Sequence, residues 1–431
     1  MQTFLLAAVL LATSLAVSAE PARATIVGAF TLPRTNLIGF GTASSTAADL
    51  LRAAGNGLRF MDLPSIGSGL ARAGDHEFWG ITDRGPNGVV RTAGGSRRTF
   101  PWPKFCPALV RYSATNGELR LTRVIPLLDR RGIPVSGLSN GAGEERLFES
   151  GEAAQPLPFD ENGVDPEAVR VLPDGRFLVS EEYSPSILVV DARGEILVRY
   201  TPTSKPLTNA TYLVKAVLPD VFAQRRANHG FESLAVSPDG SSAYAILQSP
   251  MGDEADERFA RGRRLRALKL DLQQPLDAKV VGEFLIEETA AKEYGAKAKQ
   301  EKISWSDADW IAPDTLVAVE RSKGEARLLL VNLAGATNLL GRKEEGRLVF
   351  ENADADLKML GVTAAATREL FSTRELPEID SDKIEGVVVL DQNTVVLAND
   401  NDFGLGDNET AEPSKLWIVH LAEPLPLLQA R

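Results

Sequence analysis

Carboxylate residues recur at a regular separation along this 431-residue chain. The first column, near the start of four apolar segments, consists of Glu167, Glu232, Asp307 and Glu385. The second column, at the end of the apolar segment that follows, consists of Asp83, Glu182, Glu320 and Asp400, with Gln248 in the remaining unit. The two columns are 15, 16, 13 and 15 residues apart in the four clearer units. A separation that nearly repeats indicates that each pair occupies the same place in a repeated unit.

Carboxylates that meet in one concave place repel one another and cannot all stay ionised unaided. Raised pKa values, basic partners or bound cations relieve the repulsion. The chain has a single cysteine, Cys106, and three scattered histidines, so a cysteine-based zinc site is excluded. Oxygen ligands suit Ca²⁺. We therefore predict a Ca²⁺ site formed by Glu167, Glu182, Glu232, Glu320, Glu385 and Asp400. The alternative is that these carboxylates only hydrogen-bond neighbouring strands.

Basic residues stand next to the same columns. Arg84 follows Asp83, Arg321 follows Glu320, and Lys383 lies two residues before a carboxylate. Arginine presents a planar fork that suits phosphate or carboxylate oxygens. Carboxylates, a metal and arginines together are suited to ester and phosphoester hydrolysis. The predicted catalytic residues are Asp83, Arg84, Glu232 and Arg321, and the predicted substrate contacts are Arg84, His229, Arg321 and Lys383. Alternatively, the two arginines only pair with the carboxylates beside them.

Four other polar segments carry further candidate residues. Residues 399–409 carry many oxygen-bearing side chains and form the best single loop for metal contact, although they fail the EF-hand pattern. Residues 144–146 and 252–257 read as solvated charges. Ser139 lies in a Gly-x-Ser-x-Gly sequence, but it lacks the strand and helix that a nucleophile elbow needs. We therefore do not expect Ser139 to be a nucleophile.

The carboxylate columns belong to units of two apolar strands joined by a tight turn. Pro-Asp-Gly at 173–175 and at 238–240 is typical of such turns. A further strand pair follows each hairpin, as in residues 186–198. Four strands repeated around an axis are the blades of a propeller. The sequence therefore predicts an all-β fold, a β-propeller with five recognisable blade units and five or six blades, with small helical and loop insertions.

The insertions and the closing strand follow from the same interpretation. Residues 132–158 and 203–229 are expected to be irregular, and 287–302 and 353–371 to be helical. Residues 25–32 could supply the strand that closes the ring, since closure removes exposed sheet edges. The first strand of each blade lines the channel of a propeller, so both carboxylate columns should face one mouth.

The N-terminus reads as a targeting segment. Residues 4–17 are apolar and too short to span a bilayer, and Ala22-Arg23-Ala24 is typical of a signal-peptide cleavage site, with a second cut possible after Ala19. We expect a signal peptide over 1–24 and a single domain over 25–431. The mature protein would be periplasmic or secreted, a monomer, and without a membrane span. The net charge of −11 argues against nucleic acid as a partner.

Several motifs together resemble a known family. They are Gly80-Ile-Thr-Asp-Arg-Gly-Pro-Asn87, Asp165-Pro-Glu-Ala-Val169, Gly230-Phe-Glu-Ser-Leu234, Val319-Glu-Arg-Ser322 and Lys383-Ile-Glu-Gly386. They are similar to motifs of the phytase-like domain family, also described as having esterase-like activity of phytase, over residues 38–421. The resemblance implies a propeller related to the calcium-dependent β-propeller phytases, and hydrolysis of phosphoesters or carboxylesters.

Three hypotheses for function stay open. The first is a secreted hydrolase of small-molecule phosphoesters or simple esters, with a divalent metal held by carboxylates at the channel mouth. The second is a non-catalytic extracytoplasmic propeller that binds a ligand or a protein. The third is a Ca²⁺-dependent propeller similar to the lactonases. Metal dependence separates the first and third hypotheses from the second, and phosphate release separates the first from the third.

Overall fold

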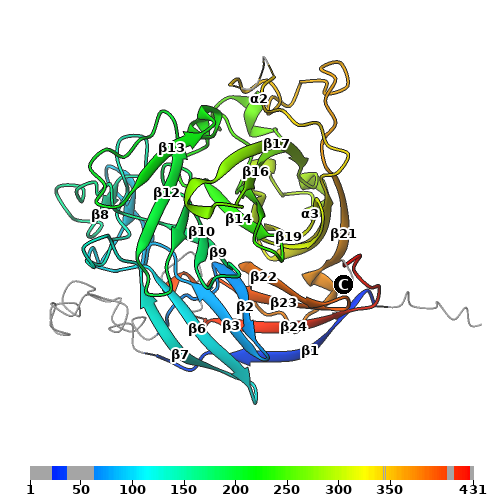
Figure 1. Ribbon diagram of the computed structural model, residues 1–431, viewed down its shortest axis with the longest axis horizontal. Helices are drawn as coiled ribbons and strands as arrows, with labels where there is room; N and C mark the ends of the chain where they lie inside the picture. Colours follow the sequence, from blue (N-terminus) through cyan, green and yellow to red (C-terminus); the bar gives the residue numbers. More distant parts are fainter. Residues whose placement is uncertain (1–21, 36–62, 343, 345, 405–411, 428–431) are drawn as a thin grey trace, which may run out of the picture.

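The computed structural model describes residues 22–35, 63–342, 344, 346–404 and 412–427, which fold mainly into antiparallel strands (Figure 1). The innermost strands are β2 (Gly69–Gly74), β9 (Pro166–Val171), β14 (Phe231–Val236), β18 (Ser304–Ala312) and β22 (Ile384–Asp391). They contact one another in the order β2–β9–β14–β18–β22, and β22 contacts β2 again. The first strands of the sheets therefore form a closed ring.

An antiparallel sheet runs outward from each inner strand. From each inner strand the strands follow in the orders β2–β3–β6–β7, β9–β10–β11–β12, β14–β15–β16–β17, β18–β19–β20–β21 and β22–β23–β24–β1. The first and last sets are joined through β7 and β1 into one eight-stranded sheet, and β13 (Val214–Leu218) adds a fifth strand beside β12. The other strands of these sets are β3 (Glu77–Ile81), β6 (Ala108–Thr115), β7 (Glu118–Pro126), β10 (Phe177–Glu181), β11 (Ser186–Val190), β12 (Ile196–Pro202), β15 (Ser242–Leu247), β16 (Arg264–Asp271), β17 (Lys279–Glu287), β19 (Thr315–Ser322), β20 (Glu325–Asn332), β21 (Ala366–Ser372), β23 (Thr394–Asn399), β24 (Lys415–Leu421) and β1 (Ala24–Thr31). Sheets that radiate from a ring of inner strands are the architecture of a β-propeller. The predicted all-β fold is confirmed.

Apolar side chains fill the spaces between neighbouring sheets. Trp79 of β3 packs edge-on against Phe177 of β10, with ring centroids 4.9 Å apart. Strands covered on both faces read as continuous apolar runs, and every residue of β11 (Ser186–Val190) is buried. The core therefore lies between the sheets, and the centre of the ring is left to polar groups.

An ion pair crosses the centre of the ring. Asp307 of β18 accepts from Arg170 of β9 at 2.9 and 3.1 Å, and both side chains are buried. The Arg170 guanidinium also donates to the carbonyl of Leu70 on β2 at 2.6 Å and to that of Val387 on β22 at 3.3 Å. This pair therefore ties four inner strands together at one level of the ring.

The N-terminal strand completes the last sheet. β1 pairs antiparallel with β24 and meets β7 through one parallel pair, Thr31 with Glu118. Figure 1 shows β1 in dark blue beside β24 in red. Residues 25–32 therefore supply the expected closing strand. Residues 1–21 of the predicted signal peptide lie outside the described residues.

The connecting segments hold short helices and extra strands. They contain η3 (Asp220–Gln224), α2 (Glu257–Ala260), η4 (Pro275–Asp277), α3 (Ala291–Tyr294), η5 (Gln300–Lys302), η6 (Thr373–Glu375), η7 (Asp402–Gly404), β4 (Gly88–Thr92), β5 (Gly95–Thr99), β8 (Leu147–Phe148) and β13 (Val214–Leu218). The helical prediction for 287–302 holds only for α3 and η5. The helical prediction for 353–371 is wrong, because this segment forms turns and then enters β21, where pairing with β20 overrides the local propensity.

Candidate functional site

A polar cavity of about 550 Å³ opens at the end of the ring where the inner strands begin. Its lining includes the carboxylates Asp83, Glu167, Glu182, Glu232, Glu301, Asp382, Glu385, Asp400 and Asp402, and the basic residues Arg84, Arg98, His229, Lys302, Arg321, Lys323 and Lys383. Three members of each predicted carboxylate column are among them. The two columns therefore face one mouth, as the repeat predicts.

Strand irregularities aim three glutamates into this cavity. Glu167 sits at a register shift between β9 and β10, Glu232 at one between β14 and β15, and Glu385 at one between β22 and β23. A residue at such a bulge is left out of the strand pairing, and its side chain is redirected. One carboxylate oxygen from each of the three glutamates lies within 4.8 Å of the other two.

The fourth unit carries the same bulge, but its residues differ from those expected. In β18 and β19, Trp305 pairs with Glu320 and Ala308 pairs with Ala318. Ser306 therefore occupies the first-column position, which is a glutamate in the other three units. Arg321 occupies the second-column position of this unit. Ser306 and Arg321 are 15 residues apart, as in two of the other units, whereas Asp307 and Glu320 are 13 apart. The predicted alignment of this unit is therefore wrong by one position in each column: Ser306, not Asp307, is the first-column residue, and Arg321, not Glu320, is the second-column residue.

Glu320 and Asp307 consequently lie away from the cavity. The Glu320 carboxylate is buried and accepts from Trp305 Nε1 at 3.0 Å, the Tyr294 hydroxyl at 2.9 Å and the Thr289 amide at 2.8 Å. Asp307 belongs to the ion pair with Arg170. The structure thus does not bring Glu320 to the other predicted metal ligands, and its role is to fix the strands and the α3 segment.

Two of the three glutamates, Glu167 and Glu232, form no ion pair among the described residues, whereas Glu385 pairs with Arg321 and Lys383. Glu167 has no hydrogen bond or ion pair of its side chain among the described residues, and Glu232 Oε2 is buried without a hydrogen-bond partner. Burial and the nearby carboxylates of Glu232, Asp165, Glu182 and Glu385 raise the pKa of Glu167 well above its usual range. Burial raises the pKa of Glu232 to about 7 and, despite Lys383 and Arg321, that of Glu385 to about 8. Three ionised glutamates at this place would be more stable with a bound cation than without one.

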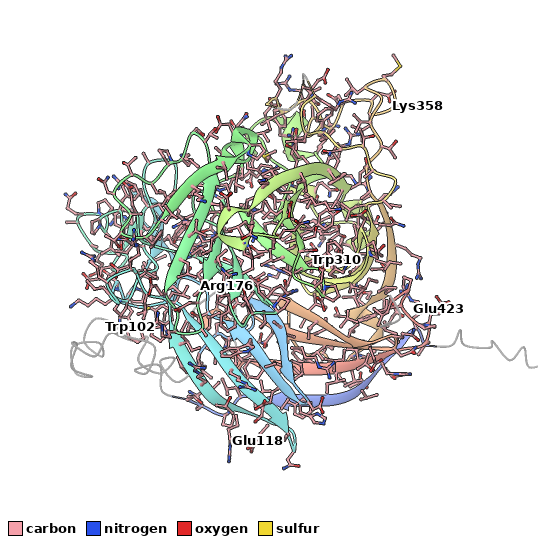
Figure 2. The ribbon with its side chains drawn as sticks, viewed as in Figure 1. Trp102, Glu118, Arg176, Trp310, Lys358 and Glu423 are labelled. Carbon is pink, nitrogen blue, oxygen red and sulfur yellow. The ribbon has the colours of Figure 1, made fainter. Side chains whose placement is uncertain are left out.

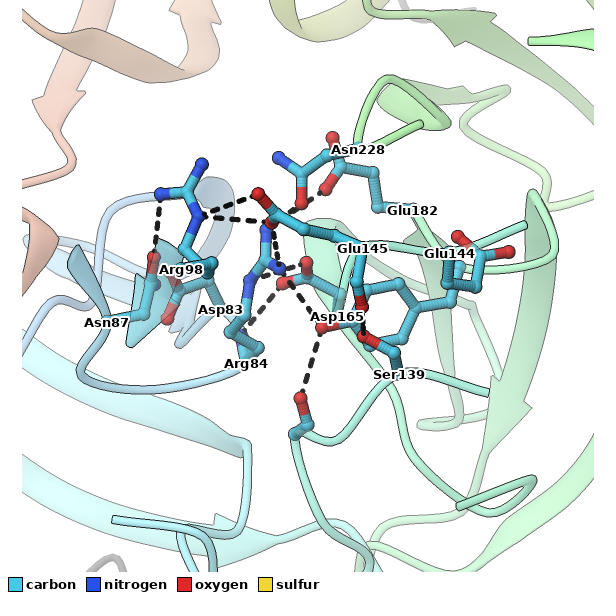
Figure 3. Close-up of polar contacts among 12 residues, drawn as sticks. Asp83, Arg84, Asn87, Arg98, Ser139, Glu144, Glu145, Asp165, Glu182 and Asn228 are labelled. Carbon is cyan, nitrogen blue, oxygen red and sulfur yellow. Dashed lines mark hydrogen bonds and ion pairs between the residues drawn. The ribbon is translucent and has the colours of Figure 1, made fainter. Parts of the chain in front are cut away.

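Arg84 is a fixed charge in the cavity wall (Figure 3). Its Nε lies 2.9 Å from Asp165 Oδ2, and its backbone amide donates to the other oxygen of that carboxylate at 2.9 Å. The guanidinium also donates to the Tyr183 hydroxyl at 3.1 Å, to Glu182 at 3.4 Å and to the Asn228 side chain. These bonds occupy the fork, so Arg84 positions Asp165 and Glu182 around the mouth.

Arg321 and Lys383 are two further basic residues that line the cavity. Arg321 donates to Glu385 at 2.6 Å and to the Ser306 hydroxyl at 3.0 Å. Lys383 lies 2.7 Å from Asp402 and 3.4 Å from Glu385, and it also pairs with Asp400. Although burial opposes it, Lys383 lowers the pKa of Asp400 to about 2. Asp400 therefore stays ionised and is already neutralised by a lysine.

Asp83 differs from its neighbours because no base contacts its carboxylate. Its only hydrogen bond among the described residues comes from the Gly85 amide at 2.8 Å. Burial, together with Asp400 and Asp165, raises the pKa of Asp83 well above the ordinary value. Asp83 is therefore a carboxyl group that keeps its proton more readily than a typical aspartate.

The structure adds residues that the sequence interpretation missed. Lys302 and Lys323 line the cavity and have no side-chain hydrogen bond or ion pair in the described part of the chain. Asp165 lies two residues before Glu167, and Asp402 lies two residues after Asp400. Their closeness in sequence to the two carboxylate columns could have predicted both. Lys302 follows no repeat position, and only its closeness to β18 brings it to the mouth.

Three of the other polar segments also have their outcome here. Residues 144–145 are not solvated charges: Glu144 is buried, accepts from the Ser184 amide at 3.0 Å and pairs with Arg225, and Glu145 contacts Arg98 at 3.0 Å. The Ser139 hydroxyl donates to the Glu145 carbonyl at 2.8 Å (Figure 3). Residues 399–404 contribute Asp400 and Asp402 to the cavity, and 405–411 lie outside the described residues.

The spacing within the glutamate trio is compatible with shared contact to one divalent cation. Ca²⁺–oxygen bonds are about 2.3–2.6 Å long, so two ligand atoms of one ion lie at most about 5 Å apart. The 4.8 Å limit within the trio fits that span. The unpartnered Glu167 carboxylate and Glu232 Oε2 would also gain a positive neighbour. A second carboxylate group, Asp165 with Glu167 and Glu182, is equally compact but already surrounds Arg84.

Three solved structures of other proteins show a distant overall likeness to this chain. An aldose sugar dehydrogenase from Streptomyces coelicolor is 12% identical, with 93% of this chain and 99% of that chain covered and a TM-score of 0.35. A periplasmic gluconolactonase from Pseudomonas aeruginosa is 11% identical (85% and 87% covered, TM-score 0.32), as is regucalcin from Agrobacterium tumefaciens (85% and 95%, TM-score 0.34). Likenesses at this level carry no conclusion about activity.

Sequence comparison is more informative. An uncharacterized secreted protein of Arthroderma benhamiae is 24% identical over an alignment of 287 positions that covers 57% of this chain. The chain spans about half the length of that curated relative, 54%. Within the described residues, no helix has the length and apolar character needed to cross a bilayer. The family described as "Phytase-like: Esterase-like activity of phytase" matches residues 66–403, a range that includes the whole glutamate trio. The chain therefore belongs to the Phytase-like family.

Proposed function

We propose that this protein is an extracytoplasmic hydrolase of small-molecule phosphoesters or simple esters, and that its acidic cavity binds Ca²⁺ through Glu167, Glu232 and Glu385. The observation that carries the proposal is the convergence of three buried glutamates, from three different inner strands, in a cavity that also presents basic side chains. The family membership supports ester chemistry.

The cavity residues divide into three proposed roles. A divalent cation at the trio would supply positive charge to the ester oxygens as negative charge develops there. Lys302 and Lys323, which line the cavity and form no ion pair among the described residues, would attract the anionic part of the substrate. Asp83, whose pKa is raised, would donate a proton to the leaving oxygen. Arg84 and Arg321 would hold the surrounding carboxylates in place.

The remaining features of the proposal follow from the fold and the N-terminal segment. We infer a propeller of five blades, one for each inner strand, with β1 completing the last blade. We also infer a signal peptide, export to the periplasm or the medium, and a monomer without nucleic-acid partners.

The test is hydrolysis under control of the metal. The purified mature chain is expected to cleave 4-nitrophenyl phosphate or 4-nitrophenyl acetate, to lose this activity to a chelator and to regain it with Ca²⁺. Glu232→Gln keeps volume but removes a ligand charge, and it should lower the rate and the Ca²⁺ affinity at least about 10-fold, or about 1.4 kcal/mol.

The matched control is Glu118→Gln. Glu118 is exposed at the tip of the β6–β7 hairpin, at the lower edge of the molecule in Figure 2, and it does not line the cavity. Its replacement should change neither property. A melting temperature indifferent to chelator, with no cleavage of either ester, would overturn the proposal in favour of a binding propeller. Ca²⁺-dependent cleavage of lactones alone would favour the lactonase hypothesis.

A further inference from the structure

His229 stands at a wall shared by two cavities. It lines the acidic cavity, and it also lines a second cavity of about 580 Å³ that is bordered by Arg226, Gly252 and Glu254. Its Nδ1 lies 3.0 Å from the Ser249 hydroxyl, which is buried at the end of β15. This bond takes up Nδ1, so Nε2 is the ring nitrogen left for a ligand.

Hydrogen bonds and ion pairs of its side chains hold the loop of residues 225–229, which carries His229, in place. Arg225 donates to the Glu182 carbonyl at 3.3 Å and pairs with Glu144. Arg226 donates to the carbonyls of Gly252 at 3.1 Å and Phe259 at 2.9 Å. Asn228 has a left-handed backbone, with φ of 57°, and accepts from Arg84.

Three anchored residues within the four positions before His229 leave the His229 ring little freedom. A group held in this way can be positioned against a substrate before the substrate arrives, and little ordering is then needed on binding. The loop therefore has the features of a built part of the site.

The Ser249 contact selects one tautomer of the imidazole. If Nδ1 carried the proton and donated to Ser249, the buried hydroxyl hydrogen would have no acceptor among the described residues, at a cost of about 1–3 kcal/mol. If Ser249 donates to Nδ1, both groups are satisfied. The proton of the neutral ring then lies on Nε2.

The surroundings also oppose a second proton on the ring. Burial, and the positive charges of Arg226, Lys302, Arg225 and Arg321, lower the pKa of His229 to about 3. His229 therefore stays neutral at ordinary pH, although it lies beside an acidic cavity.

We propose that Ser249 fixes His229 as a neutral Nε2–H tautomer, and that this N–H donates a hydrogen bond to a phosphoryl or carbonyl oxygen of the substrate. The donor role rests on the proposed hydrolytic function, whereas the tautomer does not. Under this inference His229 is a catalytic hydrogen-bond donor and not a general base. Ser249 is a positioning residue that acts through it.

The tautomer can be observed directly because the chain has only three histidines, and His76 and His420 are exposed. Long-range ¹H–¹⁵N spectra of the histidine-labelled full chain should show one ring with an unprotonated Nδ1 and a protonated Nε2 at both about pH 5 and about pH 8. His420→Gln assigns one of the exposed rings. Ser249→Ala should convert the fixed ring to a mixture of tautomers. A protonated Nδ1, or a second proton gained by the fixed ring between about pH 8 and about pH 5, would overturn the assignment.

The donor role has a separate test on the Ca²⁺-loaded protein. An amide can replace a neutral N–H donor but not a base, so His229→Gln should keep kcat within about 10-fold, whereas His229→Phe should lose about 100-fold. Inorganic phosphate should shift the Nε2–H resonance of the wild type. Equal losses in the Gln and Phe variants would refute the donor role and leave general-base catalysis. A phosphate-induced shift without hydrolysis would uphold the donor and refute only the proposed reaction.

Discussion

The pH dependence of Ca²⁺ binding is the sharpest consequence of the glutamate trio. Without metal, the pKa of Glu232 is raised to about 7 and that of Glu385 to about 8, and that of Glu167 is also raised. A ligand carboxyl must lose its proton before it binds the ion. Ca²⁺ affinity should therefore rise with pH through about pH 7–8 and level off above it.

The two values set the size of the effect. At about pH 6 a carboxyl with a pKa of about 7 is about one-tenth ionised, and one with a pKa of about 8 is about one-hundredth ionised. The product predicts binding about 1,000-fold weaker at about pH 6 than at about pH 9, or about 4 kcal/mol. Protonation of Glu167 would enlarge this difference.

The sign of the stability change is opposite for the metal-free protein. Carboxyls with raised pKa values stabilise the fold while protonated, and this contribution is lost as pH rises through their folded-state values of about 7 and 8. The metal-free chain should therefore melt lower at about pH 9 than at about pH 6. The stabilisation by a fixed Ca²⁺ concentration should be larger at the higher pH.

Titration calorimetry in buffers of different ionisation enthalpy measures both affinity and released protons. Near pH 6 we expect about two or more protons per Ca²⁺, and about one fewer in Glu232→Gln. Equal affinity at the two pH values without proton release would refute the reasoning. It would mean that the trio is already ionised through Arg321 and Lys383, or that the ion binds elsewhere.

Three further predictions test the fold around the cavity. Glu320→Gln should lower the free energy of unfolding by about 2 kcal/mol in urea titrations, because the Glu320 carboxylate accepts three buried hydrogen bonds. These bonds lie outside the site, so Ca²⁺ affinity should not change. A loss of Ca²⁺ affinity would contradict the corrected alignment. Arg170→Met should cost about 3–5 kcal/mol in the same assay by leaving Asp307 buried and unpaired, and an unchanged midpoint would contradict the central ion pair. N-terminal sequencing of the exported chain should show a cut after Ala19, since a cut after Ala24 would remove a buried residue of β1; a first residue beyond 24 would refute this.

Much of the site was predictable, because residues at equivalent places of a repeated unit occupy equivalent places in the fold. Glu167, Glu232 and Glu385 each precede an apolar run and a turn, and equivalent residues of a propeller face the same mouth. The strand bulges that turn these side chains inward leave no separate mark in the sequence. For that reason Asp307 was matched to the wrong place, although its separation of 13 residues from Glu320 already departed from the others.

The remaining site residues depend on contacts between distant segments. Asn228 reaches Arg84 across 144 positions of sequence, and Glu144 reaches Arg225 across 81. A charged residue in a loop is usually solvated, so sequence alone favours that interpretation for Glu144. Burial by a neighbouring insertion reverses it, and only the packed structure shows which insertions meet.

The place of β1 in the last sheet has a consequence for how the chain is made. Synthesis produces residues 24–31 first, but their partner, residues 415–421, emerges almost four hundred positions later. The last sheet therefore cannot be completed until residues 415–421 have been made, and before then β1 lacks its antiparallel partner. Unpaired strand edges recruit other chains. The nascent protein should thus depend on chaperones, or on delivery in an unfolded state, until its first and last strands meet.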